Sequence, residues 1–523
     1  MVLQKLTELY HELKSEGKID PMGWAQVNIA YQLNLTNDGK VEEIRPYKCR
    51  ESLPAPVRRT SHPTANFLWD NAMYLLGYPI GQKTKVDPKE YAAQCFEVSK
   101  KLHAEKLQDV DSPAAKAIVK FFETWDPENL NVDASTKKDF AKGANLEICV
   151  EGEPAAKDPA VRDAWESNAE SRDKGLDMVT GEITELEGSN PIVKGVPGTG
   201  GTGARLVSFG MESSWSYGLE KNENAPIGKD TAFAYTSALN YLLSQKTYWL
   251  GSITIVCWAK NGDSAYADQF GRFVFDANEP DLVELDPDME FYVLGLDGKK
   301  ARLAVRMFLH GKFGDMIRCA EDHYKRMDIV RPLYNDFDRV PLWKILQDAN
   351  DAMPPALLAE MLRAIVEGTP YPALMVHEIY MRVRSDGKVS RERAGMIKAY
   401  YLQHGGVPDE DLSAKLNPDS TDLPYTIGRI YSVSENLLQS SGQTLRIAMA
   451  MSSPQTMMPQ ILARVQNTEK SLMNYGKYGI VKVTEKQLRE LLGKIEGYPQ
   501  ALSMDEQGAF LLGYYHQTQA RYR

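Results

Sequence analysis

Residues 290–309 read "EFYVLGLDGKKARLAVRMFL", two apolar runs separated by a short polar stretch. The central "LDGKK" is a turn signal between runs that alternate in polarity, so the stretch predicts a β-hairpin. Side chains alternate along a strand, and the core-facing residues of the second run are therefore expected to be Leu303, Val305, Met307 and Leu309. The opposite face is expected to carry a mixed basic and aromatic set, namely Arg302, Ala304, Arg306, Phe308 and His310.

The character of the chain changes beyond this hairpin. From about residue 335, apolar residues recur at three- and four-residue spacing and β-branched runs are rare, which predicts a bundle of seven or eight helices joined by short turns. Before the hairpin, residues 251–260 predict a buried strand, and residues 24–47 predict a second hairpin around "NDGK". Further helices are expected in four stretches, residues 1–17, 87–105, 112–125 and 229–246.

The fold class is therefore α+β, with a mixed N-terminal α/β region containing β-hairpins and a C-terminal helical bundle. Four parts are expected. They are an N-terminal α/β part at 1–110, a helical and acidic loop-rich insertion at 111–190, a mixed α/β part with the basic hairpin at 191–330, and the helical bundle at 331–523.

Composition is that of a globular protein, with 43% hydrophobic and 25% charged residues among 523. No apolar run is long enough for a membrane span, and the N-terminus lacks the pattern of a secretory signal. The five cysteines are scattered and odd in number, which favours a reducing compartment without a disulfide framework.

The net charge of −10 is distributed unevenly. Residues 151–190 alone hold eleven acids and four bases, a local charge of −7. Three stretches are instead basic, and either solvated surface or contact with an anionic partner would explain them. These stretches are residues 45–64, 299–318 and 382–398.

Residues 58–77, "RRTSHPTANFLWDNAMYLLG", place three polar side chains in an apolar run. Asn66 is expected to cap a helix over 67–76 that stops at Gly77. Asp70 then lies near the first turn, where the helix dipole favours a negative charge. Capping leaves Asn71 and the basic, proline-rich approach to the segment unexplained.

The glycine-rich stretch 198–203, "GTGGTG", matches the dinucleotide fingerprint only superficially. The fingerprint requires a preceding strand and a following helix, whereas Pro197 precedes this stretch and the strand-like residues 204–209 follow it. A flexible loop that brings backbone N–H groups close to a phosphate or base is the expected structure. Residues 286–290, "DPDME", are expected to form a turn rather than a metal site, and no metal or cofactor is expected.

Four stretches taken together resemble one protein family across nearly the whole chain. They are "LPAPVRRTSHPTANFLWDNAMYLLG", "LVSFGMESSWSYGLEKNENAPIGKDTAFAYTSALNYLL", "FYVLGLDGKKARLAVRMF" and "LPYTIGRIYSVSENLLQ". The chain thereby resembles the large subunit of the type I-C CRISPR Cascade surveillance complex. Gly210 departs from the family pattern, which commonly has asparagine there.

The resemblance implies a non-catalytic, cytoplasmic prokaryotic protein that recognises the protospacer-adjacent motif (PAM) in double-stranded DNA, promotes R-loop formation and helps recruit a nuclease-helicase. The implied partners are crRNA, target DNA, the Cascade backbone and crRNA-handle subunits, and a small subunit that the C-terminal helices resemble. That small subunit can be made from an internal start, for which the candidates are Met353, Met375, Met381 and Met396.

The resemblance also gives the polar residues expected roles. Asn66 or Asn71 would touch PAM base edges, and the flanking residues Lys48, Arg58, Arg59 and Ser61 would contact the nearby backbone. The loop around Gly200 would approach the duplex, and Arg302 and Arg306 would follow the backbone or the displaced strand. Second candidates for nucleic-acid binding are Lys221, Asn222 and Asn224.

Two alternatives remain open. A nucleotide-dependent enzyme would use the glycine loop and respond to NAD, FAD or ATP. A scaffold that binds only proteins would keep its DNA affinity when Arg58, Arg59, Arg302 and Arg306 are neutralised.

Overall fold

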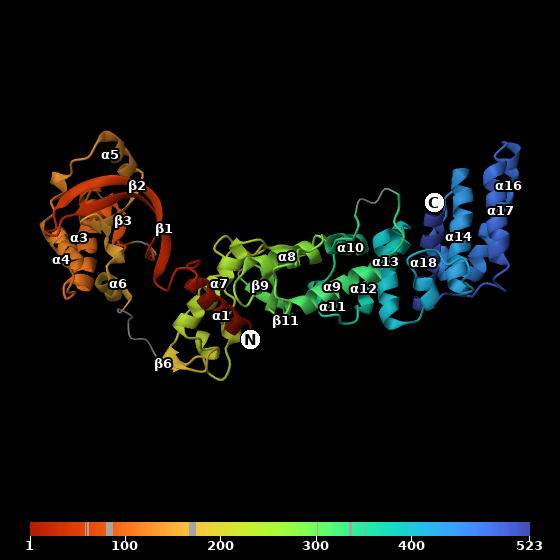
Figure 1. Cartoon of the computed structure of the whole chain (residues 1–523), viewed down its shortest axis with the longest axis horizontal. Coiled ribbons are helices and arrows are strands. Elements are labelled where there is room, and N and C mark those ends of the chain that lie inside the picture. Colours follow the sequence, from red (N-terminus) through yellow and green to blue (C-terminus); the bar gives the residue numbers. More distant parts are fainter. Residues whose placement is uncertain are drawn as a thin grey trace. The chain divides into compact units, whose positions relative to one another are not determined.

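The computed structural model describes residues 1–57, 59, 62–79, 87–166, 174–300, 302–333, 337–350 and 352–522 (Figure 1). The chain divides into two compact units. Unit 1 contains residues 3–191 and 208–238, and unit 2 contains residues 192–207 and 239–523, with the first two residues divided between them. The finer four-part division remains a prediction.

Unit 1 is built around a mixed sheet of strand order β2-β1-β4-β3, with a short β5 paired to β4. The predicted N-terminal hairpin is confirmed, because β1 and β2 pair antiparallel through the "NDGK" turn, while β4 runs parallel to β1. The strands are β1 (Trp24–Leu35), β2 (Val41–Pro54), β3 (Trp69–Asn71), β4 (Asn145–Val150) and β5 (Glu153–Pro154).

Helices pack on this sheet through a continuous apolar core in which Leu33, Ile118 and Leu146 are fully buried. Helix α3 begins as its sequence predicts, with Asp87 accepting from the N–H groups of the first turn and Pro88 at the first position. The helices of unit 1 are α1 (Val2–Ser15), α2 (Ala72–Leu76), α3 (Pro88–Leu107), α4 (Pro113–Thr124), α5 (Ala134–Ala141) and α6 (Pro159–Glu166), with single turns η1 (Pro127–Asn129) and η2 (Ala155–Lys157).

The rest of unit 1 is largely irregular and includes a two-stranded sheet. Its elements are β6 (Lys174–Leu176), β7 (Ile183–Glu185), η3 (Glu212–Ser214), η4 (Lys221–Asn224) and the first part of α7 (Lys229–Ser244).

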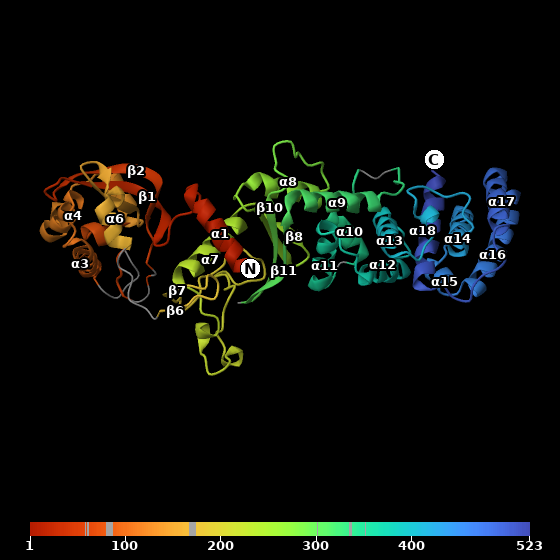
Figure 2. The ribbon, with the colours of Figure 1, turned by 60° about the horizontal axis from the view of Figure 1, so that its bottom comes forward.

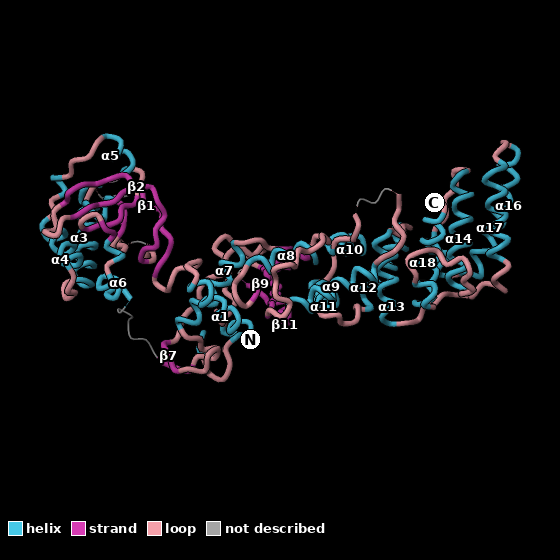
Figure 3. Tube along the Cα trace, in the orientation of Figure 1, coloured by secondary structure: helices cyan, strands magenta, loops and turns pink. Residues whose placement is uncertain are grey.

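Unit 2 joins an antiparallel sheet of order β11-β10-β9-β8 to a helical bundle (Figures 1 and 3). Helices α8, α9 and α11 (Pro355–Val366) contact the sheet, and one apolar core runs from Phe291 in β10 to Tyr515 in the last helix. The strands and first helices are β8 (Tyr248–Leu250), β9 (Ile253–Ala259), β10 (Glu290–Lys299), β11 (Arg302–Lys312), α8 (Ser264–Val274) and α9 (Phe313–Met327).

The helices that follow confirm the predicted C-terminal bundle, although the described residues form nine α-helices where seven or eight were predicted, the additional one being the short α15. They are α10 (Leu342–Ala349), α11 (Pro355–Val366), α12 (Ala373–Asp386), α13 (Arg391–His404), η5 (Asp409–Leu412), α14 (Leu423–Ser440), α15 (Ile447–Ser452), α16 (Pro454–Asn474), α17 (Tyr478–Leu492) and α18 (Met504–Ala520). With half of the chain in helices and 17% in strands, the α+β class is confirmed.

Two sequence predictions about the region around the β10–β11 hairpin are wrong. Residues 204–209 form no strand; only isolated bridges occur, from Ala204 to Val193 and from Arg205 to Arg302. Val305 is 43% exposed rather than in the core. A register shift leaves Arg306 without an opposite residue, since Gly295 faces Met307 and Leu296 faces Val305. Such a bulge breaks the alternation of side chains at that point.

Helices α14 and α18 meet at two glycines. A Cβ on Gly428 would lie 2.0 Å from the Phe510 carbonyl oxygen, and one on Gly513 would lie 2.1 Å from that of Tyr425. Gly428→Ala must therefore push two helix backbones apart, and we expect a loss of about 1–3 kcal/mol in the free energy of unfolding.

Chemical denaturation monitored by circular dichroism measures this effect. The matched control is Gly479→Ala in α17, where nothing lies within 4 Å of the added Cβ. That variant should be neutral or more stable, because alanine is the better helix former. Equal stability of the two variants would contradict the close helix contact.

Candidate nucleic-acid interface

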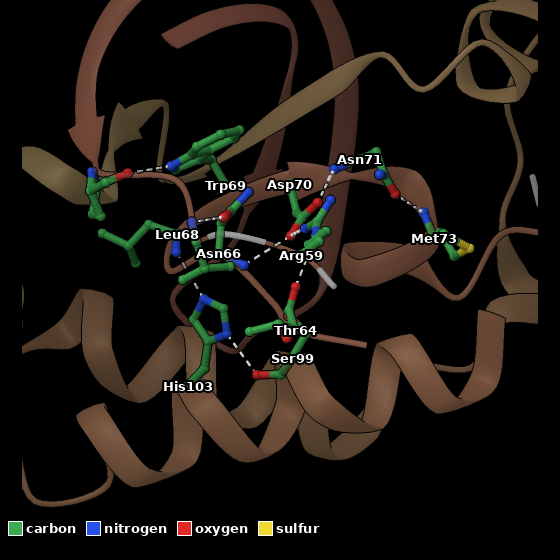
Figure 4. A network of polar contacts seen from close by, with 12 residues as sticks. Arg59, Thr64, Asn66, Leu68, Trp69, Asp70, Asn71, Met73, Ser99 and His103 are labelled. Atoms are coloured by element: carbon green, nitrogen blue, oxygen red, sulfur yellow. Dashed lines mark hydrogen bonds and ion pairs between the residues drawn. The ribbon is translucent and has the colours of Figure 1, made fainter. Parts of the chain in front are cut away.

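The segment around β3 and α2 forms a closed polar network (Figure 4). Asp70 is fully buried, forms an ion pair with Arg59, and accepts hydrogen bonds from the backbone N–H groups of Asn66 and Asn71 at 2.9 and 2.8 Å. Burial raises the pKa of the Asp70 carboxyl, and the charge of Arg59 opposes that rise. Asp70 therefore stabilises the segment that leads into α2 by contacting residues on both sides of it.

Arg59 is held on three sides. Besides the ion pair with Asp70, its Nε donates to the Thr64 carbonyl at 2.9 Å, and its guanidinium lies 4.0 Å from the centre of the Tyr74 ring. About a third of its side chain (34%) remains exposed. The structure thus gives Arg59 an internal role beside any contact with phosphate. Arg58 and Ser61 lie outside the described residues.

The predicted helix over 67–76 with Asn66 as its cap is wrong. Residues Trp69–Asn71 pair with β4, and the helix begins only at Ala72. Asn71 is the cap, with Oδ1 accepting from the Met73 N–H at 3.0 Å, and Gly77 ends the helix in the left-handed conformation as predicted. Strand pairing therefore overrode the local helix signal and moved the cap by five residues.

Asn66 and Asn71 differ in what they can offer to a ligand. Asn66 is 4% exposed, and its Oδ1 accepts from the Val57 N–H at 3.0 Å. Asn71 is half-buried, its Oδ1 is used by the cap, and its Nδ2 donates to no described residue. Neither amide nitrogen donates to a described residue, so exposure distinguishes the two side chains: Asn71 is half-buried, whereas Asn66 is almost completely buried.

His103, which the sequence analysis missed, supports this segment from α3. Leu68 adopts the left-handed conformation (φ 67°) and donates its N–H to His103 Nε2 at 2.9 Å, while Nδ1–H donates to the Ser99 carbonyl at 2.8 Å. The ring is completely buried and stacks between Phe67 and Phe122. Burial lowers the pKa of His103 to about 4, so the neutral ring is the one present.

Lys48 projects from the edge of the sheet. It is exposed in β2, at an irregularity where Cys49 faces Ile29 but Pro46 faces Tyr31. Its backbone is left-handed (φ 51°), a conformation that is uncommon for lysine and that occurs here at a bulge in the strand. β2 is the edge strand of the described sheet, and the Lys48 side chain is exposed there.

The glycine loop packs on the turn of the β10–β11 hairpin instead of standing free. The Gly200 N–H donates to the Lys300 carbonyl at 3.2 Å, and a Cβ on Gly198 would lie 2.1 Å from the Gly298 oxygen. Gly200 itself is exposed with open space around it. The expected flexible loop is thus a hydrogen-bonded one, and the helix that a dinucleotide site requires does not follow it.

Lys221, Asn222 and Asn224, the second candidates for nucleic-acid binding, lie in the single turn η4. Asn224 Oδ1 accepts from the Ser216 N–H, and its Nδ2 donates to the Leu219 and Lys221 carbonyls. Asn222 Nδ2 donates to the Glu187 carbonyl at 3.0 Å. Lys221 is exposed and left-handed (φ 46°). The two asparagines therefore have local structural partners.

On the hairpin, Arg302 and Arg306 are both exposed. Arg306 donates to Asp297 Oδ2 from Nε at 2.9 Å and from a terminal nitrogen at 2.6 Å. Phe308 and His310 each stack on Tyr292, which confirms that they share a face.

Three of the six cations in the basic stretch 382–398 are buried, namely Arg391, Arg393 and Lys398. Arg393 is 2% exposed, and its guanidinium pairs with Asp386 and Asp348. Lys398 is also buried, with Nζ donating to the Arg326 and Asp328 carbonyls at 3.1 and 2.7 Å. Neither cation is exposed for a partner.

Among the described residues, no group of three or more His, Cys, Asp or Glu side chains could hold a metal ion. No helix in the described part of the chain is long and apolar enough to cross a membrane.

Comparison with known proteins gives one family. The model of a family described as CRISPR-associated protein (Cas_Csd1) matches residues 6–522. No curated protein matches the sequence. Since the match covers nearly the whole chain, this protein belongs to the Csd1 family of CRISPR-associated proteins.

Proposed function

We propose that the protein is the non-catalytic large subunit of a type I-C Cascade complex, which recognises the PAM in double-stranded DNA, promotes R-loop formation and helps recruit a nuclease-helicase. The family match over residues 6–522 carries this proposal, together with the four stretches that resemble that subunit. The proposed partners are crRNA, target DNA, the backbone and crRNA-handle subunits, and the small subunit.

In RNA-guided complexes, base pairing reads the target and the protein reads only the PAM and the backbone. The segment around α2 suits such a reader because Asp70, Arg59 and His103 fix its backbone. A fixed backbone holds a reading side chain in place before DNA arrives, so less ordering is required on binding.

Asn71 is the proposed reader of the PAM. Its Nδ2 donates to no described residue and can serve as a donor to a base edge. In this proposal the PAM is read from the minor groove, which presents mainly acceptors. Lys48 and the exposed part of Arg59 would contact phosphates, and Arg302 and Arg306 would follow the backbone. Asn66 is buried and, in this proposal, only supports the segment.

Asn71→Ser tests this assignment. Serine also caps helices well but lacks the amide donor, so the fold should persist while PAM discrimination by the assembled complex relaxes by about 1–3 kcal/mol. Binding of PAM-containing and PAM-altered duplexes measures the difference. Asn66→Ala is the control and should keep the discrimination. Full discrimination by the Asn71→Ser complex would exclude Asn71 as the reader.

The nucleotide-dependent enzyme remains the alternative. The glycine loop packs against the β10–β11 hairpin, and no helix directly follows it. A phosphate bound there would therefore lack the helix N-terminus that binds phosphate in a dinucleotide site. Thermal-shift titration with NAD, FAD and ATP decides between the two functions. A saturable micromolar response would favour the enzyme, and no response is expected.

A further inference from the structure

The β6–β7 hairpin of unit 1 presents an apolar face to solvent. Leu176 in β6 lies directly opposite Ile183 in β7, and cross-strand partners share a face of the sheet. These side chains are 54% and 70% exposed, and Met178, two residues after Leu176, is 63% exposed. Single apolar residues on a surface are ordinary, whereas a cluster of large ones marks an interaction site. Leu176, Met178 and Ile183 are called the hairpin patch below.

The opposite face of the hairpin packs on the chain. Gly175 and Thr184 pair across the two strands, and side chains alternate along a strand. A Cβ on Gly175 would lie 2.6 Å from Leu186 Cδ1, and one on Gly228 would lie 2.6 Å from Thr184 Cγ2. One face of the hairpin is therefore covered by the protein itself, and the cross-strand pair of the hairpin patch lies on the other.

Asp177 holds the hairpin in a fixed position. Its buried carboxylate accepts from the Val179 N–H at 2.8 Å and from the Thr231 hydroxyl in α7 at 2.6 Å. The Met178 N–H donates to the Pro226 carbonyl at 3.0 Å, and Figure 2 shows the hairpin beside α7. The hairpin patch is thus exposed on a fixed backbone, and a fixed backbone reduces the ordering that binding requires.

The surroundings of the hairpin patch are acidic. Residues 174–190 contain four acids and one base, a charge of −3. Glu182 is exposed beside Ile183, and no described residue forms an ion pair with it. This charge repels the phosphates of a nucleic acid, and the patch has no aromatic ring that could stack on a base. A second copy of the chain is also disfavoured, because a symmetric contact would bring two acidic surfaces together.

We propose that the hairpin patch is a docking site for the nuclease-helicase, through an apolar groove bordered by lysine and arginine. Such a groove complements both the apolar side chains and the acidic surroundings, and an enzyme that acts on DNA carries basic surface. Three apolar residues suit a transient contact, since permanent subunit interfaces are larger and more apolar. The inference rests on the proposed function, in which the nuclease-helicase is recruited to the assembled complex.

The test measures binding of the purified nuclease-helicase to the assembled complex carrying an R-loop. Leu176→Thr/Ile183→Thr removes the apolar pair but keeps residues that favour strands, and it should weaken this binding by at least about 10-fold. Glu182→Lys should weaken it by about 3–10-fold at low salt and by less at high salt. The matched control is Leu282→Thr/Val283→Thr, which changes two exposed apolar residues in an acidic loop of unit 2.

Unchanged affinity for the nuclease-helicase in both test variants, or losses no larger than in the control, would overturn the proposal. Failure of the variants to assemble with the crRNA-bound subunits would also overturn it, because the patch would then lie inside the complex. Weaker duplex binding by the Leu176→Thr/Ile183→Thr complex would identify a nucleic-acid surface instead, and a dimer of the wild-type chain that the variants abolish would identify a second copy.

PAM preference is measured on the same complexes. Both test variants should retain it, because the hairpin patch lies outside the segment proposed to read the PAM. A variant that keeps its PAM preference and also binds the nuclease-helicase normally would contradict this inference alone. Loss of PAM preference in the wild-type complex would contradict the proposed function, so the two failures are distinguishable.

Discussion

Replacing Asp70 with alanine is expected to lower the free energy of unfolding of unit 1 by about 3–5 kcal/mol. The substitution leaves the Arg59 guanidinium without its buried counter-charge and removes the acceptor of the Asn66 and Asn71 N–H groups. Unpaired groups in such a site lose hydration without compensation. Hydrogen–deuterium exchange of residues 62–79 during chemical denaturation measures the loss in this segment.

A double-mutant cycle with Arg59→Gln separates the ion pair from the backbone hydrogen bonds. The matched control is Lys116→Gln, which breaks a largely exposed ion pair with Asp111 in the same unit. That change should cost less than about 1 kcal/mol. A loss for Asp70→Ala no larger than that of the control would show that the network does not hold the segment.

Acidification is expected to destabilise the same segment through His103. The pKa of His103 is about 4 in the folded protein, below its ordinary value of 6.5, so the unfolded chain takes up this proton first as the pH falls. The contribution of the neutral His103 ring to the free energy of unfolding is fully present above pH 6.5 and is lost as the pH falls towards 4. This contribution is about 3 kcal/mol, because each pKa unit between the folded and unfolded values corresponds to about 1.4 kcal/mol. Protonation also removes the acceptor of the Leu68 N–H.

Exchange of the Leu68 amide, followed between pH 7 and pH 4, measures this effect. His103→Gln keeps a polar side chain that does not titrate, and it should flatten the pH dependence of residues 62–79. His323 and His516, whose burial lowers their pKa values to about 3 and about 4, act in the same direction in unit 2 and provide an internal comparison. An unchanged pH dependence in the His103 variant would contradict the role of the ring.

Much of the fold could be predicted from the sequence because its signals are local. The "NDGK" turn fixes the first hairpin, and helical periodicity gives the C-terminal bundle. The second hairpin was predicted from its two apolar runs, but its turn was misplaced, because "LDGK" lies within β10 and the strands pair as far as Lys299 and Arg302. Val305 and the start of α2 could not be predicted. The first depends on a bulge at Arg306, and the second on pairing of β3 with β4, which lies more than seventy residues away. Both are tertiary effects that override local patterns.

The candidate site was predicted only in part. The sequence identified Asp70, Asn66 and Asn71 as residues that need partners, but it could not show that Arg59 and His103 supply much of the network. His103 gave a weak signal, a single histidine on the apolar side of a helix. Arg393 and Lys398 belong to a stretch that was expected to be solvated or to contact an anionic partner, yet both are buried. The charge of a residue in a sequence does not reveal whether that residue is buried.

Binding of the assembled complex to duplexes with a randomised PAM tests the central claim most directly. Complexes of crRNA and the other subunits are compared with and without this chain. The proposal predicts that the complete complex prefers one PAM and that omission of this chain abolishes the preference. Equal PAM preference in the complex that lacks the chain would contradict the account.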